Sequence, residues 1–299
     1  MTIELKNVPT KGVYAAGLSV LNSDFSLDVD STIKHAESLI DNGLTGVFFF
    51  GSTGMSQLLP ISHKKKLITK ISNHKYKSKF FLGTGNNALY DNLDIINHGI
   101  KNGFETFLIM PPAYYPKTHE GVYDFYSKII QSTPKIKIIL YNFEKLSGYL
   151  FTPDSVKKLV QDFPCIIGCK DSSYNLYEKM KIKNFLMFPG SESKLLKGLE
   201  LGCSGCISAV TNVTHSLAKK VFDDFENGIE QTVNLKLIKV RETFDKYQLI
   251  SALHSFLSIQ NKKYEKVLPP LKLLSKEKQK ELISRLKQIN FLPNKNIAA

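Results

Sequence analysis

A single lysine ends an apolar stretch near the middle of the chain, at a position where an amine could act as a nucleophile. Residues 165–169 read CIIGC, and Lys170 follows directly, ahead of the helix-capping sequence DSS. A strand buried on both faces reads as such a continuous apolar run, and loss of water there disfavours the charged ammonium. A neutral amine can add to a carbonyl group and form a Schiff base. The alternative is that Lys170 leaves the strand with its ammonium in water, as most lysines do.

Hydroxyl, phenol and glycine residues follow other apolar stretches in the same way. They are Gly51, Ser52, Thr53 and Gly54 after 45–50, Tyr114 and Tyr115 after 105–110, Tyr141 at the end of 135–141, and Gly190, Ser191 and Glu192 after 185–189. If Lys170 adds to a 2-oxo acid, the imine becomes an electron sink for cleavage or formation of a carbon–carbon bond at C3. Tyr141 is then the best candidate for a proton shuttle, and the turn 51–54 for a carboxylate cradle. Taken alone, the glycines could serve only a tight turn and Tyr141 could be an ordinary barrel tyrosine.

Eight short apolar stretches must position these residues, and they alternate with helical patterns. The predicted strands are 12–20, 45–50, 80–85, 105–110, 135–141, 165–170, 185–189 and 205–208. The predicted helices are 29–42, 62–73, 89–102, 121–132, 153–162, 173–180, 191–201 and 216–227. Eight βα units with short connections predict a parallel sheet closed into a (β/α)8 TIM barrel. In such a barrel the active site lies at the carboxyl ends of the strands, so these residues should meet on one rim.

After residue 230 the strand signal disappears. The remaining patterns predict helices near 232–247, 250–261 and 276–288. We therefore expect a catalytic barrel over 1–229 and a C-terminal helical domain over 230–299.

Composition narrows the class of protein. Of the 299 residues 42% are hydrophobic and 22% charged, as in globular proteins. No apolar run approaches a membrane span, and residues 1–6 show no signal-peptide pattern, so we expect a cytoplasmic protein with no membrane partner. The net charge of +13 comes from lysines spread over nearly every helix, with only Arg241 and Arg285 as arginines. Dispersed charge without a binding motif argues against a nucleic-acid partner.

The four cysteines, Cys165, Cys169, Cys203 and Cys206, superficially resemble a four-thiolate metal site. The pairs Cys165/Cys169 and Cys203/Cys206 lie in stretches with the pattern of buried strands, whereas metal sites of this kind use turns. We therefore favour the interpretation that all four are free, buried thiols. We expect no metal and no cofactor.

Several ordered motifs make the whole chain resemble the dihydrodipicolinate synthase and N-acetylneuraminate lyase family of class I, pyruvate-handling aldolases. The motifs are Gly12-Val13-Tyr14, Asp28, Gly51-Ser52-Thr53-Gly54, Tyr114-Tyr115, Tyr141-Asn142, Ser147-Gly148, Gly168-Cys169-Lys170-Asp171, Pro189-Gly190-Ser191, Gly205-Cys206-Ile207-Ser208 and Pro269-Pro270-Leu271-Lys272. Their order and intervals are far more specific than any one motif.

The resemblance implies roles for individual residues. Lys170 would be the Schiff-base lysine and Tyr141 the proton-relay tyrosine. Ser52 and Thr53 would bind the pyruvyl carboxylate, with Ser52 also passing protons to Tyr141. Tyr115 matches a tyrosine that reaches a neighbouring subunit's site in the synthases, which implies an oligomer, usually a homotetramer built as a dimer of dimers. The backbone of Ile207 would face the pyruvyl group, and the remaining substrate-binding candidates are Gly51, Ser147, Gly190 and Glu192.

Departures from the family pattern concern the second substrate. In genuine synthases an arginine two residues before the glycine of the loop binds that substrate's carboxylate, but here the residue is Leu146, which cannot form a bidentate pair. Leu146-Ser147-Gly148 and Ser52 look more like the lyases, and Met55 replaces a glutamate. We therefore expect an aldolase or lyase acting on a 2-oxo-3-deoxy sugar acid or sialic-acid-like substrate. The runner-up condenses pyruvate with aspartate semialdehyde, as dihydrodipicolinate synthase does. A non-catalytic 2-oxo acid binding protein on the same scaffold is the third reading.

Overall fold

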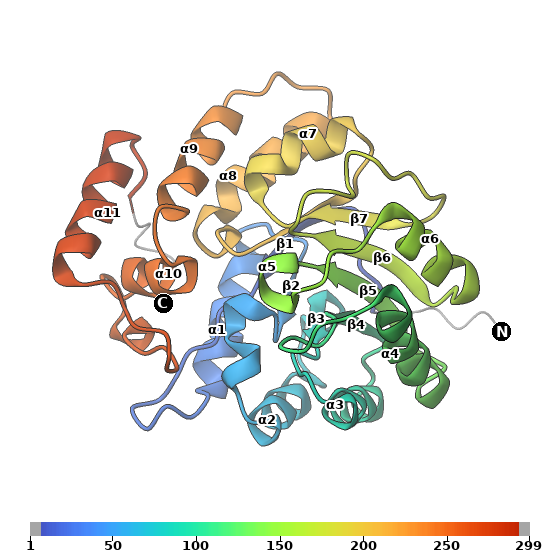
Figure 1. The fold of residues 1–299 in the computed structure, drawn as a ribbon. Coiled ribbons are helices and arrows are strands. Elements are labelled where there is room, and N and C mark those ends of the chain that lie inside the picture. Colours follow the sequence, from blue (N-terminus) through green and yellow to red (C-terminus); the bar gives the residue numbers. More distant parts are fainter. Residues whose placement is uncertain (1–6, 293–299) are drawn as a thin grey trace.

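Eight parallel strands form a nearly closed barrel in the computed structural model, which describes residues 7–292 (Figure 1). The strands are β1 (Gly12–Ala16), β2 (Gly46–Phe49), β3 (Phe80–Gly83), β4 (Thr106–Ile109), β5 (Lys137–Asn142), β6 (Ile166–Asp171), β7 (Leu186–Pro189) and β8 (Gly205–Ser208). Their order is β7-β6-β5-β4-β3-β2-β1-β8. A hydrogen bond from Ser204 N to Met187 O, 2.8 Å long, joins the two ends of this order. The predicted TIM barrel is thus confirmed; residues 1–6, in which we expected no signal sequence, lie outside the described part.

Helices alternate with the strands and surround them (Figure 1). They are α1 (Val29–Asp41), α2 (Ile61–Ile71), α3 (Leu89–Lys101), α4 (His119–Ser132), α5 (Glu144–Ser147), α6 (Pro153–Asp162), α7 (Leu195–Glu200) and α8 (Thr211–Glu226). Local signals explain where several begin: Asp28 accepts a hydrogen bond from Ser31 N at 2.9 Å, and Thr152 caps α6 ahead of a first-turn proline. Side-chain oxygens at these positions satisfy N–H groups that have no partner within the helix.

The predicted helix over 173–180 is wrong. Residues after β6 form turns and bends instead. The carboxylate of Asp171 accepts hydrogen bonds from the backbone N–H groups of Tyr174, Leu176 and Tyr177, at 2.9 to 3.0 Å. Tyr174 has a positive φ of 59°, which an α-helix cannot contain. The residues that looked like a helix cap therefore organise a loop directly beside Lys170.

Aromatic and aliphatic side chains fill the interior of the barrel. Tyr14 packs edge-on against Phe48, Phe81 and Phe188, with ring centroids 5.6 to 5.8 Å apart. The same buried cluster also contains Leu108, Ile139 and Ile207. A packed interior of this kind leaves no pore, so space for a ligand remains only beyond the strand ends.

Helices α9 (Asn234–Phe244), α10 (Leu249–Leu257) and α11 (Lys276–Gln288) gather at one side of the barrel (Figure 1). A buried polar chain attaches them. His35 on α1 contacts Asn212 Oδ1 through Nε2 at 2.8 Å and Tyr264 OH through Nδ1 at 2.8 Å. Because Asn212 Nδ2 donates to Ala16 O and Ala209 O, Oδ1 can only accept, so Nε2 of His35 must bear the proton. Protonation of Nδ1 would remove the acceptor for Tyr264.

We expect the free energy of unfolding to fall as the pH is lowered from 6.5 towards 4. Burial lowers the pKa of His35, His215 and His254 to about 4, whereas an unfolded histidine titrates at about 6.5. Between these values the unfolded chain binds more protons, so the stabilisation is fully present above pH 6.5 and is lost as the pH falls through 4. Urea denaturation should show a loss on the order of 1–2 kcal/mol per histidine between pH 6.5 and 5.

Replacing His35 with glutamine should reduce this pH dependence, because glutamine keeps a donor and an acceptor but does not titrate. His119→Gln is the control, since His119 is exposed. A His35→Gln protein with the full wild-type dependence would show that His35 makes no such contribution.

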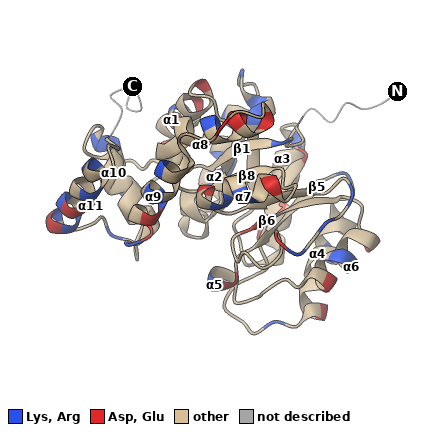
Figure 2. Cartoon of the chain, turned by 90° about the horizontal axis from the view of Figure 1, so that it is seen from above, with Lys and Arg blue, Asp and Glu red and all other residues tan. Residues whose placement is uncertain are grey.

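Charged residues are dispersed over the elements. Figure 2 shows Lys and Arg on many separate helices and loops, interspersed with Asp and Glu. Within residues 7–292, no helix is both long enough and apolar enough to cross a bilayer.

Candidate active site

Lys170 and Tyr141 lie side by side at the carboxyl ends of β6 and β5. They are partners in the parallel register of the two strands, so their side chains leave the sheet on the same face. The Nζ atom of Lys170 lies 4.3 Å from the centroid of the Tyr141 ring. Both are buried, at 3% and 4% exposure. Nζ has no hydrogen-bond or ion-pair partner in the described part of the chain, which leaves the amine available to a ligand.

A one-turn 3₁₀ helix, η1 (Ser52–Gly54), brings the hydroxyl residues to this pair. Ser52 Oγ lies 3.0 Å from Tyr141 OH, and Thr53 beside it is 4% exposed. The backbone N–H groups of Ser52 and Thr53 have no acceptor among residues 7–292. A Cβ on Gly54 would lie 2.9 Å from Gly17 O, so this turn requires glycine there. By contrast Gly51 has extended backbone, and a Cβ there would meet no other atom within 4 Å.

These side chains border a cavity of about 540 Å³ at the rim of the barrel. Lys170, Tyr141, Ser52, Thr53 and Gly190 are part of its wall. Gly190 is required by close packing, because a Cβ there would lie 2.0 Å from Ser172 Oγ. The volume lies in the range that small-molecule sites occupy. The structure thus brings together five of the ten residues that the sequence predicted.

The other five predicted residues do not border this cavity. Gly51 lines a neighbouring pocket of about 250 Å³, which also touches Ser52, Tyr141 and Leu146. Ile207 is buried in the barrel interior, and Ser147 is buried and bonded to Phe143 O and Tyr149 O, each at 3.1 Å. Tyr115 is 73% exposed. These residues could act on a ligand only through neighbours, through backbone atoms or, for Tyr115, in another subunit.

Glu192, the fifth, is fully buried and already has partners. Its carboxylate accepts hydrogen bonds from Arg241 Nη1 at 3.2 Å, from Thr214 Oγ1 at 3.3 Å and from the hydroxyl of Ser208. Three donors to one carboxylate satisfy a buried charge. The structure therefore places Arg241, and not Glu192, at the cavity surface.

Sequence reasoning missed the contribution of the C-terminal helices. Arg241 on α9, Asp245 just after it and Leu249 at the start of α10 all border the cavity. Arg241 Nε donates to Asp245 Oδ1 at 2.8 Å. Burial alone would lower the pKa of Arg241, but the carboxylates of Glu192 and Asp245 raise it above its ordinary value. A signal was available: Arg241 is one of two arginines in a lysine-rich chain, with a carboxylate four residues later.

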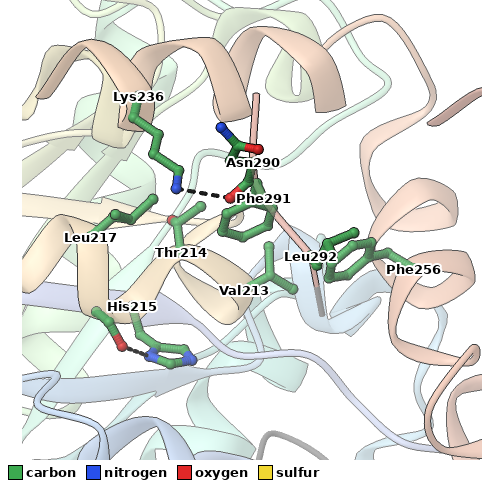
Figure 3. A pocket seen from close by; sticks show the side chains of 10 residues that line it. Val213, Thr214, His215, Leu217, Lys236, Phe256, Asn290, Phe291 and Leu292 are labelled. Carbon is green, nitrogen blue, oxygen red and sulfur yellow. Dashed lines mark hydrogen bonds between the residues drawn. The ribbon is translucent and has the colours of Figure 1, made fainter. Parts of the chain in front are cut away.

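Another, smaller cavity of about 190 Å³ lies between α8, α9 and the segment Asn290–Leu292 (Figure 3). Lys236 Nζ donates to Asn290 O at 2.9 Å, and His215 Nδ1 lies 2.9 Å from Ser216 Oγ. Val213, Phe256 and Phe291 give this cavity an apolar wall. None of the residues around Lys170 borders it.

The fold is a TIM barrel, and its site holds a buried strand-end lysine beside a strand-end tyrosine. This combination is typical of class I aldolases, which are lyases that work through a lysine Schiff base. The model of the dihydrodipicolinate synthetase family matches residues 9–289. The chain therefore belongs to the dihydrodipicolinate synthetase family and is a pyruvate-dependent aldolase.

Individual relatives include enzymes of both anticipated kinds. A 4-hydroxy-tetrahydrodipicolinate synthase from Methanothrix thermoacetophila is 28% identical over 73% of this chain and 75% of its own. A 2-dehydro-3-deoxy-D-gluconate/2-dehydro-3-deoxy-phosphogluconate aldolase from Picrophilus torridus is 23% identical over 85% of this chain and 97% of its own. Among solved structures, YagE from E. coli K12, a family member crystallised with pyruvate, has a TM-score of 0.86 at 22% identity, covering 94% of this chain and 99% of its own.

Proposed function

We propose that the protein reversibly cleaves a 2-oxo-3-deoxy sugar acid, or a sialic-acid-like substrate, to pyruvate and an aldehyde through an imine on Lys170. The observation that carries this proposal is the unpartnered, 3%-exposed amine of Lys170 beside Tyr141 on the wall of a 540 Å³ cavity. A desolvated amine adds readily to a carbonyl carbon. The cavity has room for a sugar-acid chain beyond the reacting carbonyl.

The steps follow from the chemistry of imines. Lys170 Nζ adds to C2 of the substrate, and loss of water gives a protonated imine. Tyr141 donates its phenolic proton to the departing water and, as the phenolate, then accepts the proton of the C4 hydroxyl as the C3–C4 bond breaks. The bonding electrons move to the imine nitrogen, giving an enamine and a free aldehyde. Protonation of the enamine at C3 and addition of water release pyruvate and restore the amine. The 3.0 Å contact between Tyr141 and Ser52 offers a path for the transferred protons.

The carboxylate of the 2-oxo acid would bind at η1. The backbone N–H groups of Ser52 and Thr53 and the two hydroxyls provide donors there, and donors to a charged acceptor make strong hydrogen bonds. Ser52 would then both hold the substrate and pass protons to Tyr141. Gly190 forms part of the cavity wall, where the absence of a side chain allows close packing against Ser172.

The choice of a sugar acid over aspartate semialdehyde rests on Leu146. The resemblance places the arginine of synthases at this position, and Leu146 is 43% exposed and uncharged. The aldolase from P. torridus, named for 2-dehydro-3-deoxy sugar acids, is similar over most of both chains and supports the same choice. Synthase activity remains the second candidate, favoured by the relative from M. thermoacetophila. The Lys170–Tyr141 pair argues against a purely binding role.

We further propose a homotetramer, built as a dimer of dimers, in which Tyr115 reaches the site of a neighbouring subunit. Tyr114 and Tyr115 are 89% and 73% exposed, with ring centroids 5.0 Å apart. Adjacent large exposed apolar side chains are typical of a protein interface.

We expect slow or undetectable condensation of pyruvate with aspartate semialdehyde. Charged hydrogen bonds contribute about 1.5–3 kcal/mol each, and Leu146 supplies none of them to the semialdehyde carboxylate. The semialdehyde should bind at least about tenfold to a hundredfold more weakly than to an arginine-bearing synthase. A panel of sugar acids and aspartate semialdehyde, with release or consumption of pyruvate as the readout, tests both expectations.

Leu146→Arg provides the matched comparison. If the missing guanidinium limits synthase activity, this variant should gain semialdehyde condensation. Efficient wild-type condensation at ordinary semialdehyde concentrations, with no cleavage of any sugar acid, would instead favour the synthase.

A further inference from the structure

Arg241 differs from an ordinary anion-binding arginine because two carboxylates already neutralise it. Its Nη1 donates to Glu192 Oε2 and to Ser208 Oγ, each at 3.2 Å, and its Nε donates to Asp245 Oδ1 at 2.8 Å. Glu192 is fully buried and Asp245 about half exposed. Nη2, with two N–H donors, has no partner within residues 7–292. Arg241 thus brings donors to the cavity without bringing net positive charge.

Apart from Lys170, the charged residues at the cavity carry a net negative charge. They are Glu144, Lys145, Arg241 and Asp245 on its wall, together with Glu192, which is in contact with Arg241. Two positive and three negative charges leave one net negative charge. In a partly buried cavity such charges act more strongly than in water. A dianionic phosphate would be repelled by this net negative charge. It would also have to compete with the carboxylates of Glu192 and Asp245 for the guanidinium of Arg241.

We infer that the cavity selects substrates with a neutral, polyhydroxylated tail and discriminates against the same substrates with a phosphate on the tail, and that Arg241 and Asp245 determine this preference. The hydroxyl groups of a sugar chain can accept hydrogen bonds from Nη2 of Arg241 and donate hydrogen bonds to the carboxylate of Asp245. A neutral tail forms these bonds without disturbing the Arg241–Glu192 pair. The inference rests on the proposed sugar-acid function, since it specifies the tail of that substrate.

The test compares two ligands that cannot be cleaved. They are a 3-deoxy-hexonic acid with a hydroxyl at C2, which cannot form an imine, and its 6-phosphate. Both compete with pyruvate in the exchange of its methyl protons with heavy water, a reaction that needs only the Lys170 imine and is followed by NMR. The neutral-tailed acid should have an inhibition constant at least tenfold lower than the phosphate. Equal competition, stronger competition by the phosphate, or no competition by the neutral acid would overturn the inference.

Two variants of Asp245 test whether this residue determines the preference for a neutral tail. Asp245→Asn removes one negative charge, and Asp245→Ala also releases Nε of Arg241. Each variant should bind the phosphate more tightly. The inhibition constant of the phosphate divided by that of the neutral-tailed acid should therefore fall at least fivefold. Arg241 is unsuitable for the test because its loss would leave Glu192 buried and unpaired, whereas Asp245 is half exposed.

Glu281→Gln is the matched control. It breaks another arginine–carboxylate pair four residues apart, with Arg285 at 2.7 Å on α11, and neither residue borders the cavity. This variant should leave the ratio unchanged, and unchanged ratios in both Asp245 variants would overturn the assignment. Failure of the sugar-acid function is seen separately, as absence of pyruvate release from the corresponding 2-oxo acids.

Discussion

Replacing Lys170 with alanine is expected to abolish both turnover and the trapping of pyruvate by borohydride. Lys145 also borders the cavity but is exposed, so Lys170 is the desolvated amine there, and activity should fall by at least about 10⁴-fold in its absence. Alanine removes a buried amine without leaving a charge unpaired, because Nζ has no ion-pair partner in the described residues, and the fold should therefore persist. Mass spectrometry after treatment with pyruvate and borohydride should locate the added mass on Lys170 in the wild-type protein and find none in the variant.

Lys64 is the internal control for this labelling. It is also fully buried, and burial lowers its pKa to about 8, so it too could react as a free amine. Its ammonium, however, is held by Thr84 O at 3.0 Å, Gly85 O at 3.3 Å and Asn86 Oδ1 at 2.7 Å. Labelling of Lys64, or labelling that survives Lys170→Ala, would disprove the assignment of the nucleophile.

Tyr141→Phe is expected to lower kcat by about 10²–10⁴, with a smaller effect on substrate affinity. In the proposed mechanism the phenol of Tyr141 moves protons after the substrate has bound, and phenylalanine keeps the ring that packs beside Lys170. Pyruvate should therefore still be trapped on Lys170 while cleavage slows. Steady-state kinetics on the best substrate of the panel, together with trapping, separate these two effects.

Tyr126→Phe is the matched control for that variant. Tyr126 is fully buried and donates to Ile109 O at 2.8 Å, but it does not border the cavity. Losing this hydrogen bond should lower stability by about 1 kcal/mol and leave kcat unchanged. A Tyr141→Phe enzyme with the wild-type turnover number would mean that Tyr141 only packs against the substrate.

The alternation of apolar stretches with amphipathic ones was sufficient to predict the barrel and the strand that ends at Lys170. Parallel strands buried on both faces have a simple pattern, and strand ends converge wherever a barrel closes. The loop after β6 was mispredicted because Asp171 looks the same in sequence whether it caps a helix or organises a turn. The positive φ of Tyr174 and the hydrogen bonds from Leu176 N and Tyr177 N to Asp171 show that it organises a turn.

Long-range pairing limited the prediction of the site. Glu192 looked available to a substrate because its partners, Ser208, Thr214 and Arg241, come from three later segments. No local pattern links an acidic residue after β7 to an arginine on α9. Pairing of this kind is decided by how the C-terminal helices pack on the barrel, which periodicity does not specify.

The position of Arg241 on α9 has an evolutionary consequence. The proposed nucleophile, Lys170, belongs to β6, whereas Arg241 and Asp245 belong to a later, separate stretch of the gene. Point mutation or recombination in that stretch can change the part of the cavity wall formed by Arg241 and Asp245, while the strand that bears Lys170 stays as it is. The part of the cavity wall contributed by α9 can therefore vary independently of the strand that carries the proposed chemistry.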